Sequence, residues 1–427
     1  MTRHAIYDMV LNLTYRIVKL SCTKFIASIF PKNKKSKFIL GQREVPGKVS
    51  ETSFPDNTVW FHASSLGELA VLRPIIKRIR TNGYHVVLTF FSPTGVDGTI
   101  NHINTKYADA DHIFYLPIDT RKNARNFIEK VRPLFVVFAI SEIWPNYLFE
   151  LKRKNIHTFL ISSKINPNSA VVKWYGGIFR DAYRCFTHIA CLDEESKKIL
   201  CGYNINNVSV TGDPLFDNAV VNSRKEYTNE KVERFCSGHK VFIAGSIHDK
   251  NDLDMVSYVA NKNRDDKFIF VPHEISDETL NAIKYHVEGK CLLYSECDID
   301  TNLDDVQVLV IDFLGALAQL YRYCDYAYVG GGFTPFLHSV IEATVYGLPV
   351  AFGPRIERKT TPLQLVELGI GMIVKDGKQL NTWYKSLKND AQVLDTIKSK
   401  ARIYTNNNTG ATDNIIQMIK EHVKYAL

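Results

Sequence analysis

The sequence lacks several features that would have assigned it to a class at once. Its 8 cysteines are scattered, with no Cys-x-x-Cys pair and no Cys/His spacing suited to zinc. We therefore expect reduced thiols, without a disulfide framework or a metal cluster. There is no Gly-x-Gly-x-x-Gly fingerprint of a dinucleotide-dependent dehydrogenase and no low-complexity stretch. What remains, 427 residues with 45% hydrophobic and 23% charged side chains, is typical of a globular protein of two domains.

Most of the chain also lacks a charge imbalance. Residues 1–48 hold 10 basic and 2 acidic side chains, which accounts for the whole net charge of +8. The neutral remainder argues against a broad nucleic-acid surface, so no nucleic-acid partner is expected. The basic N-terminal segment instead favours an anionic surface as its neighbour.

The N-terminal segment has the pattern of an amphipathic helix. Charges interrupt it too often for a spanning helix of about 20 apolar residues, and no small-residue cleavage site marks a signal peptide. A polybasic run, Pro31–Lys37, follows the helical pattern. We predict that residues 1–37 form a membrane-anchoring helix and basic run on an anionic bilayer surface; the alternative is a helix packed on the body, with a solvated charge run behind it. The apolar positions at helical spacing are Ile6, Val10, Leu13, Ile17 and Leu20.

From about residue 57 the chain alternates short β-rich runs with helical patterns. This alternation predicts parallel sheets with helices on both faces, and therefore two doubly wound, Rossmann-like α/β domains. We place the N-terminal domain at 45–215, a polar linker at 216–238 and the C-terminal domain at 239–427, with the last helix packing back on the first domain. Ligands of such sheets bind outside the carboxyl ends of the strands, so the site is expected in a cleft that the two domains face. The predicted strands are Val59–Phe61, Val86–Phe91, Phe135–Ile140, Thr158–Ser162, His188–Leu192, Val208–Thr211, Val241–Ala244, Phe268–Val271, Leu292–Tyr294, Val306–Ile311, Tyr326–Val329 and Pro349–Phe352.

A strand-loop-helix pattern at Trp60–Ala70 contains the first candidate catalytic residue. The β-rich run breaks at Ser65 and Gly67, and an apolar helical pattern starts at Leu69. Glu68 then lies on the first helical turn, beside amide N–H groups that favour anions. Its carboxylate can act as a general base toward a molecule bound over the loop, or can merely complement the helix dipole.

A glycine-rich loop follows a predicted strand in the second half of the chain. The segment Tyr328–Phe333 contains three glycines, of which Gly331 and Gly332 are candidate ligand contacts. Glycine allows close approach of the backbone and frees N–H groups for an anion; a tight turn is the alternative. His338 and Glu342 are spaced to share one face of a helix whose N-terminus points toward this loop. Glu342 can hold ribose hydroxyls, and the alternative is an ordinary surface pair.

Three further loops of the second half also follow predicted strands. They are Ala244–Ser246, Pro272–Glu274 and Asp312–Gly315. Together with the glycine loop they can line one edge of the second sheet, which is stronger evidence for a ligand site than any single motif. Their candidate contacts are Gly245, Ser246, His273, Glu274 and Gly315.

Taken together, these residues resemble the Kdo transferases, the lipid A glycosyltransferases that attach 3-deoxy-D-manno-octulosonic acid (Kdo). Ser65–Glu68 resembles the family's S-V-G-E motif, whose Glu is taken as the catalytic base. Phe91–Gly95 resembles its T-P-T-G loop, and Ser141–Asn146 its E-L-W-P-N signature. Thr211–Asp213 resembles the T-G-N turn that closes the first domain, and the four loops of the second half resemble the nucleotide half. The resemblance covers nearly the whole chain, including an N-terminal membrane anchor.

The resemblance implies the GT-B glycosyltransferase fold and the transfer of Kdo from CMP-Kdo to a lipid A precursor, lipid IVA, with inversion. It implies Glu68 as the base that deprotonates an acceptor hydroxyl. Glu142, which follows an apolar strand, is a second candidate catalytic acid, for acceptor or Kdo binding, with a structural ion pair as the alternative. His62 is predicted to be structural, with ligand contact as the alternative. No cofactor and no metal are implied, and the expected location is the cytoplasmic face of the cell inner membrane, in lipopolysaccharide biosynthesis. The acceptor-side residues would be Ser65, Gly67, Thr94 and Gly95.

The sequence departs from the family pattern at three places. Pro272–Glu274 reads Pro-His-Glu where most members have P-R-H, so the expected Arg is missing from the phosphate contacts. His338 is followed by Ser339 in place of the family's H-N, and Ser162–Lys164 replaces N-a-R. Two alternatives therefore stay open. One is another GT-B enzyme that uses a different nucleotide sugar, such as a UDP-sugar transferase or epimerase, and the other is a non-catalytic, membrane-bound protein that binds sugar nucleotides.

Overall fold

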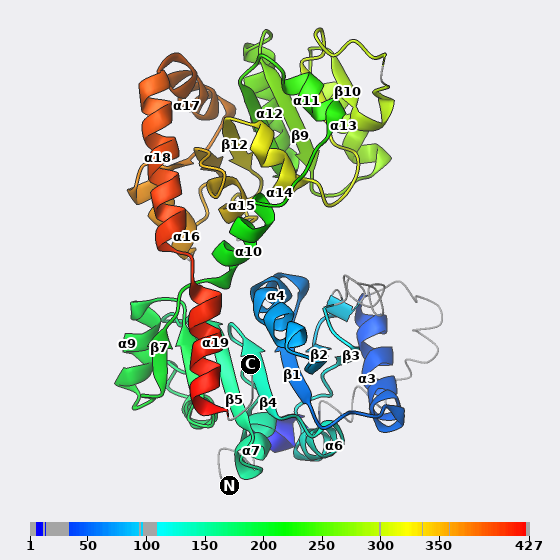
Figure 1. The fold of residues 1–427 in the computed structure, drawn as a ribbon, viewed down its shortest axis with the longest axis vertical. Coiled ribbons are helices and arrows are strands. Elements are labelled where there is room, and N and C mark those ends of the chain that lie inside the picture. Colours follow the sequence, from blue (N-terminus) through cyan, green and yellow to red (C-terminus); the bar gives the residue numbers. More distant parts are fainter. Residues whose placement is uncertain are drawn as a thin grey trace. The chain divides into compact units, whose positions relative to one another are not determined.

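The chain forms two compact units, each built around one parallel sheet (Figure 1). A computed structural model describes residues 6–11, 13, 34–93, 95–96, 109–298, 300–334, 336–357 and 359–423. The first unit comprises Met1–Asp217 and Thr409–Leu427, and the second comprises Asn218–Asn408. The predicted architecture of two doubly wound α/β sheets is confirmed.

The first unit contains a seven-stranded sheet in the order β3-β2-β1-β4-β5-β6-β7, with all neighbours parallel. Its strands are β1 (Thr58–Ala63), β2 (His85–Phe90), β3 (His112–Tyr115), β4 (Phe135–Ala139), β5 (His157–Ser163), β6 (His188–Cys191) and β7 (Val208–Val210). Its helices are α3 (Lys34–Glu51), α4 (Leu66–Thr81), α6 (Arg121–Val131), α7 (Pro145–Arg153), α8 (Gly177–Tyr183), α9 (Glu194–Gly202) and α19 (Ala411–His422), and α10 (Pro214–Ser223) crosses the boundary to the second unit.

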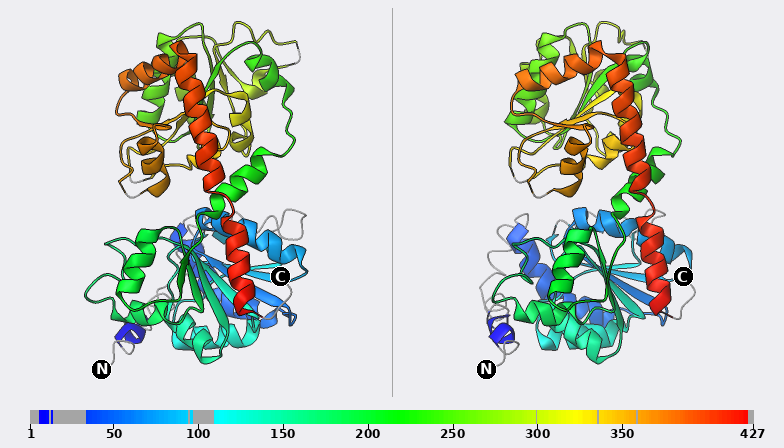
Figure 2. Two further views of the ribbon diagram at one scale, coloured as in Figure 1. Left: turned by 60° about the vertical axis from the view of Figure 1, so that its left-hand side comes forward. Right: turned by 90° about the vertical axis from the view of Figure 1, so that its left-hand side faces the viewer.

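Strand β1 shows how this sheet comes to be covered on both faces. Val59, Phe61 and Ala63 belong to one buried core, to which α4 and α19 contribute. Trp60 belongs to the core on the opposite face, to which α3, α6 and α7 contribute. Successive side chains of a strand point to opposite faces, so a strand that is buried at every position requires helices on both sides. Figure 2 shows the sheet between these helices.

The second unit repeats this plan with a seven-stranded parallel sheet in the order β10-β11-β9-β8-β12-β13-β14. Its strands are β8 (Val241–Ile247), β9 (Lys267–Pro272), β10 (Cys291–Leu293), β11 (Val308–Val310), β12 (Tyr326–Val329), β13 (Val350–Phe352) and β14 (Gly371–Ile373). Its helices are α11 (Glu230–Cys236), α12 (Lys250–Lys262), α13 (Asp277–His286), α14 (Leu317–Leu320), α15 (Ile341–Thr344), α16 (Thr360–Glu367), α17 (Gly377–Asn389) and α18 (Ala391–Asn407), with short 3-10 turns at Tyr294–Glu296 and Tyr321–Tyr323.

Two strands, β3 and β14, were not predicted from the sequence. Each lies at one edge of its sheet, and neither is fully buried along its length. Edge strands are covered less than central ones, so their residues need not form an apolar run. Their sequences, HIFY and GMI, therefore carry little signal.

The boundary between the units falls inside the segment predicted to be a linker, and that segment is more ordered than a linker. It contains the end of α10 and all of α11, in which Val232 and Phe235 are buried. The last helix, α19, belongs to the first unit, where Ile415 and Ile419 are fully buried in the core. The first unit is therefore discontinuous in sequence, and the second is continuous.

Asp217 fastens α19 to the rest of the first unit. Its carboxylate accepts hydrogen bonds from the backbone N–H groups of Gly410 and Thr412, each at 2.6 Å. The N–H groups at the start of a helix have no partner within the helix, and the Asp217 carboxylate supplies one for α19. Its negative charge also complements the helix dipole. Asp217→Ala is expected to lower the free energy of unfolding of the first unit by about 1–2 kcal/mol, measured by denaturant titration. Asp395→Ala, on an exposed position of α18, is the control and should change it by no more than about 0.5 kcal/mol; an equal effect of both would contradict this role.

The N-terminal prediction is only partly within the described residues. Residues 6–11 are helical, and the basic run continues into α3, which begins at Lys34. Tyr7 donates a hydrogen bond to Asp119 at 2.9 Å, and Asp8 pairs with Arg121 at 2.9 Å, so this helical turn contacts the body. None of the helices described is both long enough and apolar enough to cross a bilayer.

Candidate active site

The first candidate site lies at the carboxyl ends of three neighbouring strands of the first sheet. Strands β2, β1 and β4 are adjacent, and the segments that follow them contain Gly95, Glu68 and Glu142 respectively. The Ser92 N–H donates to the carbonyl oxygen of Ser64 at 2.9 Å, which joins the loops after β1 and β2. This is the edge at which α/β sheets bind ligands.

Glu68 lies on the first turn of α4, which begins at Leu66 with Ser65 as its N-cap. The Glu68 carboxylate folds back and accepts a hydrogen bond from the Ser64 N–H at 2.5 Å. Burial, reinforced by the negative charge of Glu142, raises the pKa of Glu68 to about 7, and the amides of Ser64 and Ser65 only partly oppose this. A carboxylate with a pKa near neutrality is well matched to taking a proton from a hydroxyl group.

Glu142 has the opposite electrostatic character. It is only 8% exposed, and its carboxylate accepts hydrogen bonds from His62 Nε2 at 3.0 Å and Trp144 Nε1 at 2.9 Å. Burial favours the protonated acid, but hydrogen bonds from the side chains of His62, Ser64 and Trp144 outweigh it and hold the pKa of Glu142 below its usual value. The pKa values of Glu68 and Glu142 are therefore shifted in opposite directions. Paired acids whose environments shift their pKa values apart can take separate roles in a reaction.

A chain of buried hydrogen bonds fixes His62 in its place. His62 Nδ1 lies 2.8 Å from the hydroxyl of Thr89, and the same hydroxyl accepts a hydrogen bond from Trp60 Nε1 at 2.8 Å. If the Thr89 hydroxyl donates to Nδ1, the neutral ring carries its proton on Nε2 and donates it to Glu142. The predicted structural role of His62 agrees with these contacts, and Thr89 is a member of the network that the sequence did not reveal.

The predicted acceptor-side residues are placed as follows. Ser65 and Gly67 lie at the start of α4, and a side chain at Gly67 would meet open space. A Cβ at Gly95 would lie 2.3 Å from the Phe90 ring, so this glycine is required by packing. Thr94 lies outside the described residues.

The Ser141–Asn146 segment contributes to the candidate site at one end and to the packing of the first unit at the other. Glu142 and Trp144 face the His62 network, whereas the Asn146 side chain donates to the carbonyl oxygen of Asp119 at 2.6 Å. The Asp119 carboxylate accepts from the Asn146 and Tyr147 N–H groups at the start of α7. Asp119 caps the start of α7 from a loop that is distant in the sequence. A cap of this kind leaves no local sequence pattern, so Asp119 was not predicted.

In the second unit three of the four predicted loops follow β11, β9 and β12, whereas Ala244–Ser246, predicted as a loop, lies inside β8 (Val241–Ile247). These four strands are consecutive in the sheet. A Cβ on Gly245 would lie 2.4 Å from the Tyr321 hydroxyl, and Ser246 has a left-handed backbone with φ +56°. Gly315 also has a positive φ, of +90°, and a side chain there would meet open space. Glu274 is exposed. The sheet edge therefore combines tight backbone turns with open positions.

The expectation that the glycine loop offers free N–H groups is wrong. The Gly331 N–H donates to the Asp252 carboxylate at 2.9 Å, and the Gly332 N–H donates to the carbonyl oxygen of Phe336 at 2.6 Å. The glycines are needed instead for shape, because Gly331 and Gly332 have φ of +94° and +83°. Asp252 also accepts from the Tyr328 hydroxyl at 2.6 Å and the His248 N–H at 2.9 Å, so it ties the glycine loop to the loop after β8.

The predicted helix shared by His338 and Glu342 is also wrong. The helix α15 begins only at Ile341, and His338 lies in the preceding loop, where its N–H donates to the carbonyl oxygen of Gly330 at 3.2 Å. Residues 338–340, which were predicted to form the first turn of this helix, are not helical. Glu342 is half-buried on α15; burial raises its pKa, and within the described part of the chain its carboxylate has no hydrogen bond or ion pair.

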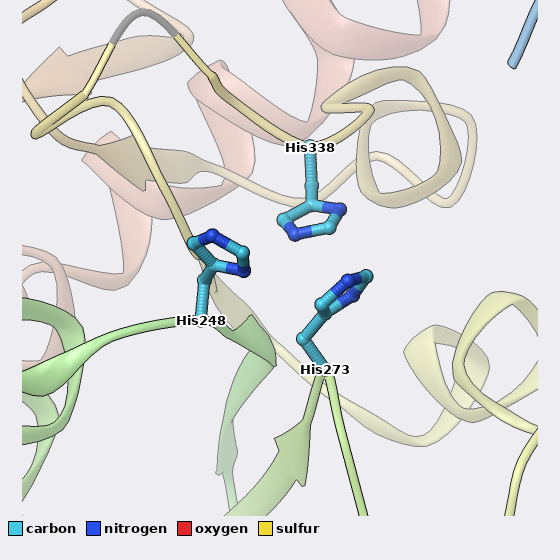
Figure 3. Close-up of side chains that lie close together, drawn as sticks. All are labelled: His248, His273 and His338. Atoms are coloured by element: carbon cyan, nitrogen blue, oxygen red, sulfur yellow. The ribbon is translucent and has the colours of Figure 1, made fainter. Parts of the chain in front are cut away.

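Three histidines of the second unit lie close enough together to hold a metal ion, a cluster that the spacing of Cys and His along the sequence did not indicate. Ligating nitrogens of His248, His273 and His338 all lie within 4.8 Å of one another (Figure 3). Burial, together with the neighbouring imidazoles, lowers the pKa of His338 to about 4. The three residues come from loops after β8, β9 and β12, so no spacing along the sequence announces the cluster.

Comparison with known proteins gives consistent assignments. A family model described as 3-deoxy-D-manno-octulosonic-acid transferase matches residues 33–218. The 3-deoxy-D-manno-octulosonic acid transferase of Chlamydia pneumoniae is 23% identical over 98% of this chain and 96% of its own length, and that of Chlamydophila psittaci is 23% identical over 86% and 84%.

Among solved structures, the UDP-GlcNAc 2-epimerase of Neisseria meningitidis bound to UDP-GlcNAc covers 86% of this chain and 100% of its own. It has a TM-score of 0.61 at 15% identity, a likeness that concerns the fold alone, and the fold is of the GT-B type. The family match over residues 33–218, the relatives that align along nearly the whole chain and this fold agree, and together they support a glycosyltransferase similar to the Kdo transferases.

Proposed function

We propose that the protein transfers Kdo from CMP-Kdo to a lipid A precursor, lipid IVA, with inversion at the anomeric carbon. The observation that carries this proposal is Glu68, a carboxyl group at the ligand edge of the first sheet whose pKa is raised to about 7. Similarity to the Kdo transferases supports Kdo as the transferred sugar.

In the proposed reaction the Glu68 carboxylate takes the proton of an acceptor hydroxyl as that oxygen attacks the anomeric carbon of Kdo. The bond from that carbon to the phosphate oxygen of CMP breaks, and CMP leaves with the electron pair. A single displacement of this kind inverts the anomeric centre and needs one base and no covalent intermediate. Glu142, held as an anion by His62 and Trp144, keeps the pKa of Glu68 high and is available to accept hydrogen bonds from the bound sugars.

We assign the donor nucleotide to the carboxyl edge of the second sheet. Glu342 has a carboxylate without a hydrogen-bond partner in the described residues, which suits ribose hydroxyls. Gly315 offers an open turn, and His273 stands where most relatives of the family have Arg. Neutral imidazole can donate one hydrogen bond to phosphate but brings no fixed charge, so we expect weaker phosphate binding at this position than an Arg would give.

We further propose that the N-terminal helix attaches the protein to the cytoplasmic face of the inner membrane. Ile6, Met9, Val10 and Leu13 are between 47% and 60% exposed and recur at helical spacing, while Tyr7 and Asp8 contact the body. An apolar stripe of this kind, followed by a basic run, suits an anionic bilayer surface. The packed alternative and the membrane role are compatible, since opposite faces of the helix serve each.

The experiment that tests this function is a transfer assay with the full chain. CMP-Kdo is generated in situ and offered with a tetra-acylated lipid A precursor, and product is measured by mass spectrometry. We expect a product heavier by one or more Kdo residues, and we expect CMP to protect the protein against thermal unfolding more strongly than UMP. Transfer from a UDP-sugar instead, or binding of CMP without any product, would contradict the proposal and favour one of the two alternatives.

A further inference from the structure

Three histidines of the second unit form a cluster that the proposed reaction does not require. Ring centroids of His273 and His338 are 4.4 Å apart, and His248 lies 5.1 Å and 5.6 Å from them. Figure 3 shows the three side chains directed into one common space from three separate segments of the chain. Converging imidazoles are the commonest nitrogen ligands of transition metals in proteins.

The backbone of each histidine is held in position. The His248 N–H donates to the buried Asp252 carboxylate at 2.9 Å, the His273 N–H to the carbonyl oxygen of Ile247 at 2.9 Å, and the His338 N–H to that of Gly330 at 3.2 Å. Asp252 in turn accepts from Gly331, so it fixes both the loop of His248 and the loop that leads to His338. The ligand set is therefore pre-organised by three adjacent strands, which is what a metal site requires of its supports.

One nitrogen of the cluster has no other role in the structure. His338 Nε2 is buried and has no hydrogen-bond partner among the described residues. The Phe336 ring lies 4.6 Å from the His338 ring and 5.4 Å from the His248 ring, so it packs against this side of the cluster. A buried polar atom without a partner is unusual, and a ligand is one explanation for it.

The distances suit a metal ion after small side-chain rotations. In a tetrahedral zinc site with bonds of about 2.0–2.1 Å, two imidazole nitrogens are about 3.4 Å apart. The ligating nitrogens here are all within 4.8 Å of one another, so each ring needs to move by less than about 1 Å. Three protein nitrogens leave a coordination position for water or for an oxygen of a bound anion.

We propose that His248, His273 and His338 bind one divalent first-row transition cation, Zn²⁺ in the first instance, through one nitrogen of each ring. The site goes beyond the proposed transfer reaction, although it shares His273 and His338 with the donor edge. Metal binding is measured without nucleotide or acceptor, so failure of the metal site and failure of the proposed function are distinguishable.

The test uses the full chain, purified without a polyhistidine tag and stripped with a chelator. Zn²⁺ is titrated in competition with a chromophoric chelator, bound metal is counted by elemental analysis, and Co²⁺ is added separately to record its visible spectrum. We expect one equivalent of metal and an intense Co²⁺ spectrum. His248→Ala, at an exposed position, and His338→Gln should each weaken Zn²⁺ binding by about 100-fold or more, because loss of an outer-shell partner alone costs 10–100-fold.

The matched control is His239→Ala, an exposed histidine outside the cluster, which should bind metal like the wild type. If His338→Gln does not fold, as judged by its circular dichroism spectrum, His248→Ala decides alone. Absence of stoichiometric metal in the wild type, or unchanged affinity in His248→Ala, overturns the proposal. Inorganic phosphate that raises the melting temperature of the wild type but not of the histidine variants, without metal uptake, overturns it in favour of an anion site.

Discussion

Glu68→Gln is expected to lower kcat for Kdo transfer by about 10²-fold or more, with little change in the fold. Glutamine has nearly the same shape and can still accept the hydrogen bond from the Ser64 N–H, but it cannot take a proton. General-base catalysis by a positioned carboxylate contributes about 10²–10⁴-fold to a rate. The measurement is single-turnover transfer with saturating donor and acceptor, so that a loss of binding is separated from a loss of chemistry.

The same variant has a second expected result, on stability. The pKa of Glu68 is about 7 in the folded protein, whereas in the unfolded chain the pKa has its ordinary value of 4.5, so the folded state binds more protons between these pH values. The free energy of unfolding of the wild type therefore falls as pH rises through this window. Glu68→Gln removes this loss and should be more stable than the wild type at pH 8, by about 1–3 kcal/mol, and equal to it at pH 4.

The control for Glu68 is Glu278→Gln, an exposed glutamate on the first turn of α13. It should change neither the rate nor the pH dependence of stability, because a solvated first-turn carboxylate only complements the dipole. If Glu68→Gln transfers Kdo at the rate of the wild type, then Glu68 is not the base, and Glu142 becomes the candidate.

The second large effect is expected at the buried pair of His62 and Glu142. His62→Ala should lower the free energy of unfolding by about 3–5 kcal/mol, because it leaves the Glu142 carboxylate buried without its main partner. His188→Ala is the comparison. This half-buried histidine is hydrogen-bonded to the neutral Ser209, and its loss should cost only about 1 kcal/mol for the hydrogen bond. Both are measured by urea unfolding at pH 8.

A double-mutant cycle separates the energy of the interaction between His62 and Glu142 from the cost of the cavity that His62→Ala creates. In the Glu142→Gln background no buried charge remains, so His62→Ala should cost less than it does in the wild type, with a coupling of about 1–3 kcal/mol. Glu142→Gln should also move the acid limb of the pH–rate profile to lower pH, since the negative charge of Glu142 helps to raise the pKa of Glu68. Additive stability losses would show that His62 and Glu142 are not coupled. An unmoved acid limb would show that the Glu142 charge does not raise the pKa of Glu68.

Local patterns in the sequence were sufficient to predict Glu68. Its position depends on one strand, one loop and the next helix, all within a few residues. The helix α4 begins at Leu66, ahead of the predicted start at Leu69, and Glu68 lies on its first turn. The fold was predictable for the same reason, because buried parallel strands form apolar runs that alternate with helices. The half-buried edge strands β3 and β14 lack such runs and were missed.

Contacts between distant segments were beyond sequence reasoning. The partners of Glu142 come from β1 and the loop after β4, and the hydroxyl that orients His62 comes from β2. The glycine loop was misread because its N–H groups are taken by Asp252 and by the loop itself, neither of which local spacing reveals. The histidine cluster was missed in the same way, since sheet order rather than sequence order brings its members together.

The discontinuity of the first unit has a consequence for synthesis on the ribosome. Residues 218–408 form a complete core and can fold as soon as they emerge, but the first unit waits for α19, whose Ile415 and Ile419 fill its core. The first unit, most of which is synthesised first, therefore completes its core last, and until then the apolar surface of α4 and β5 that α19 covers is open to chaperones and proteases. A ribosome that stalls near residue 408 would release a chain with an intact second unit and an incomplete first one, which carries Glu68.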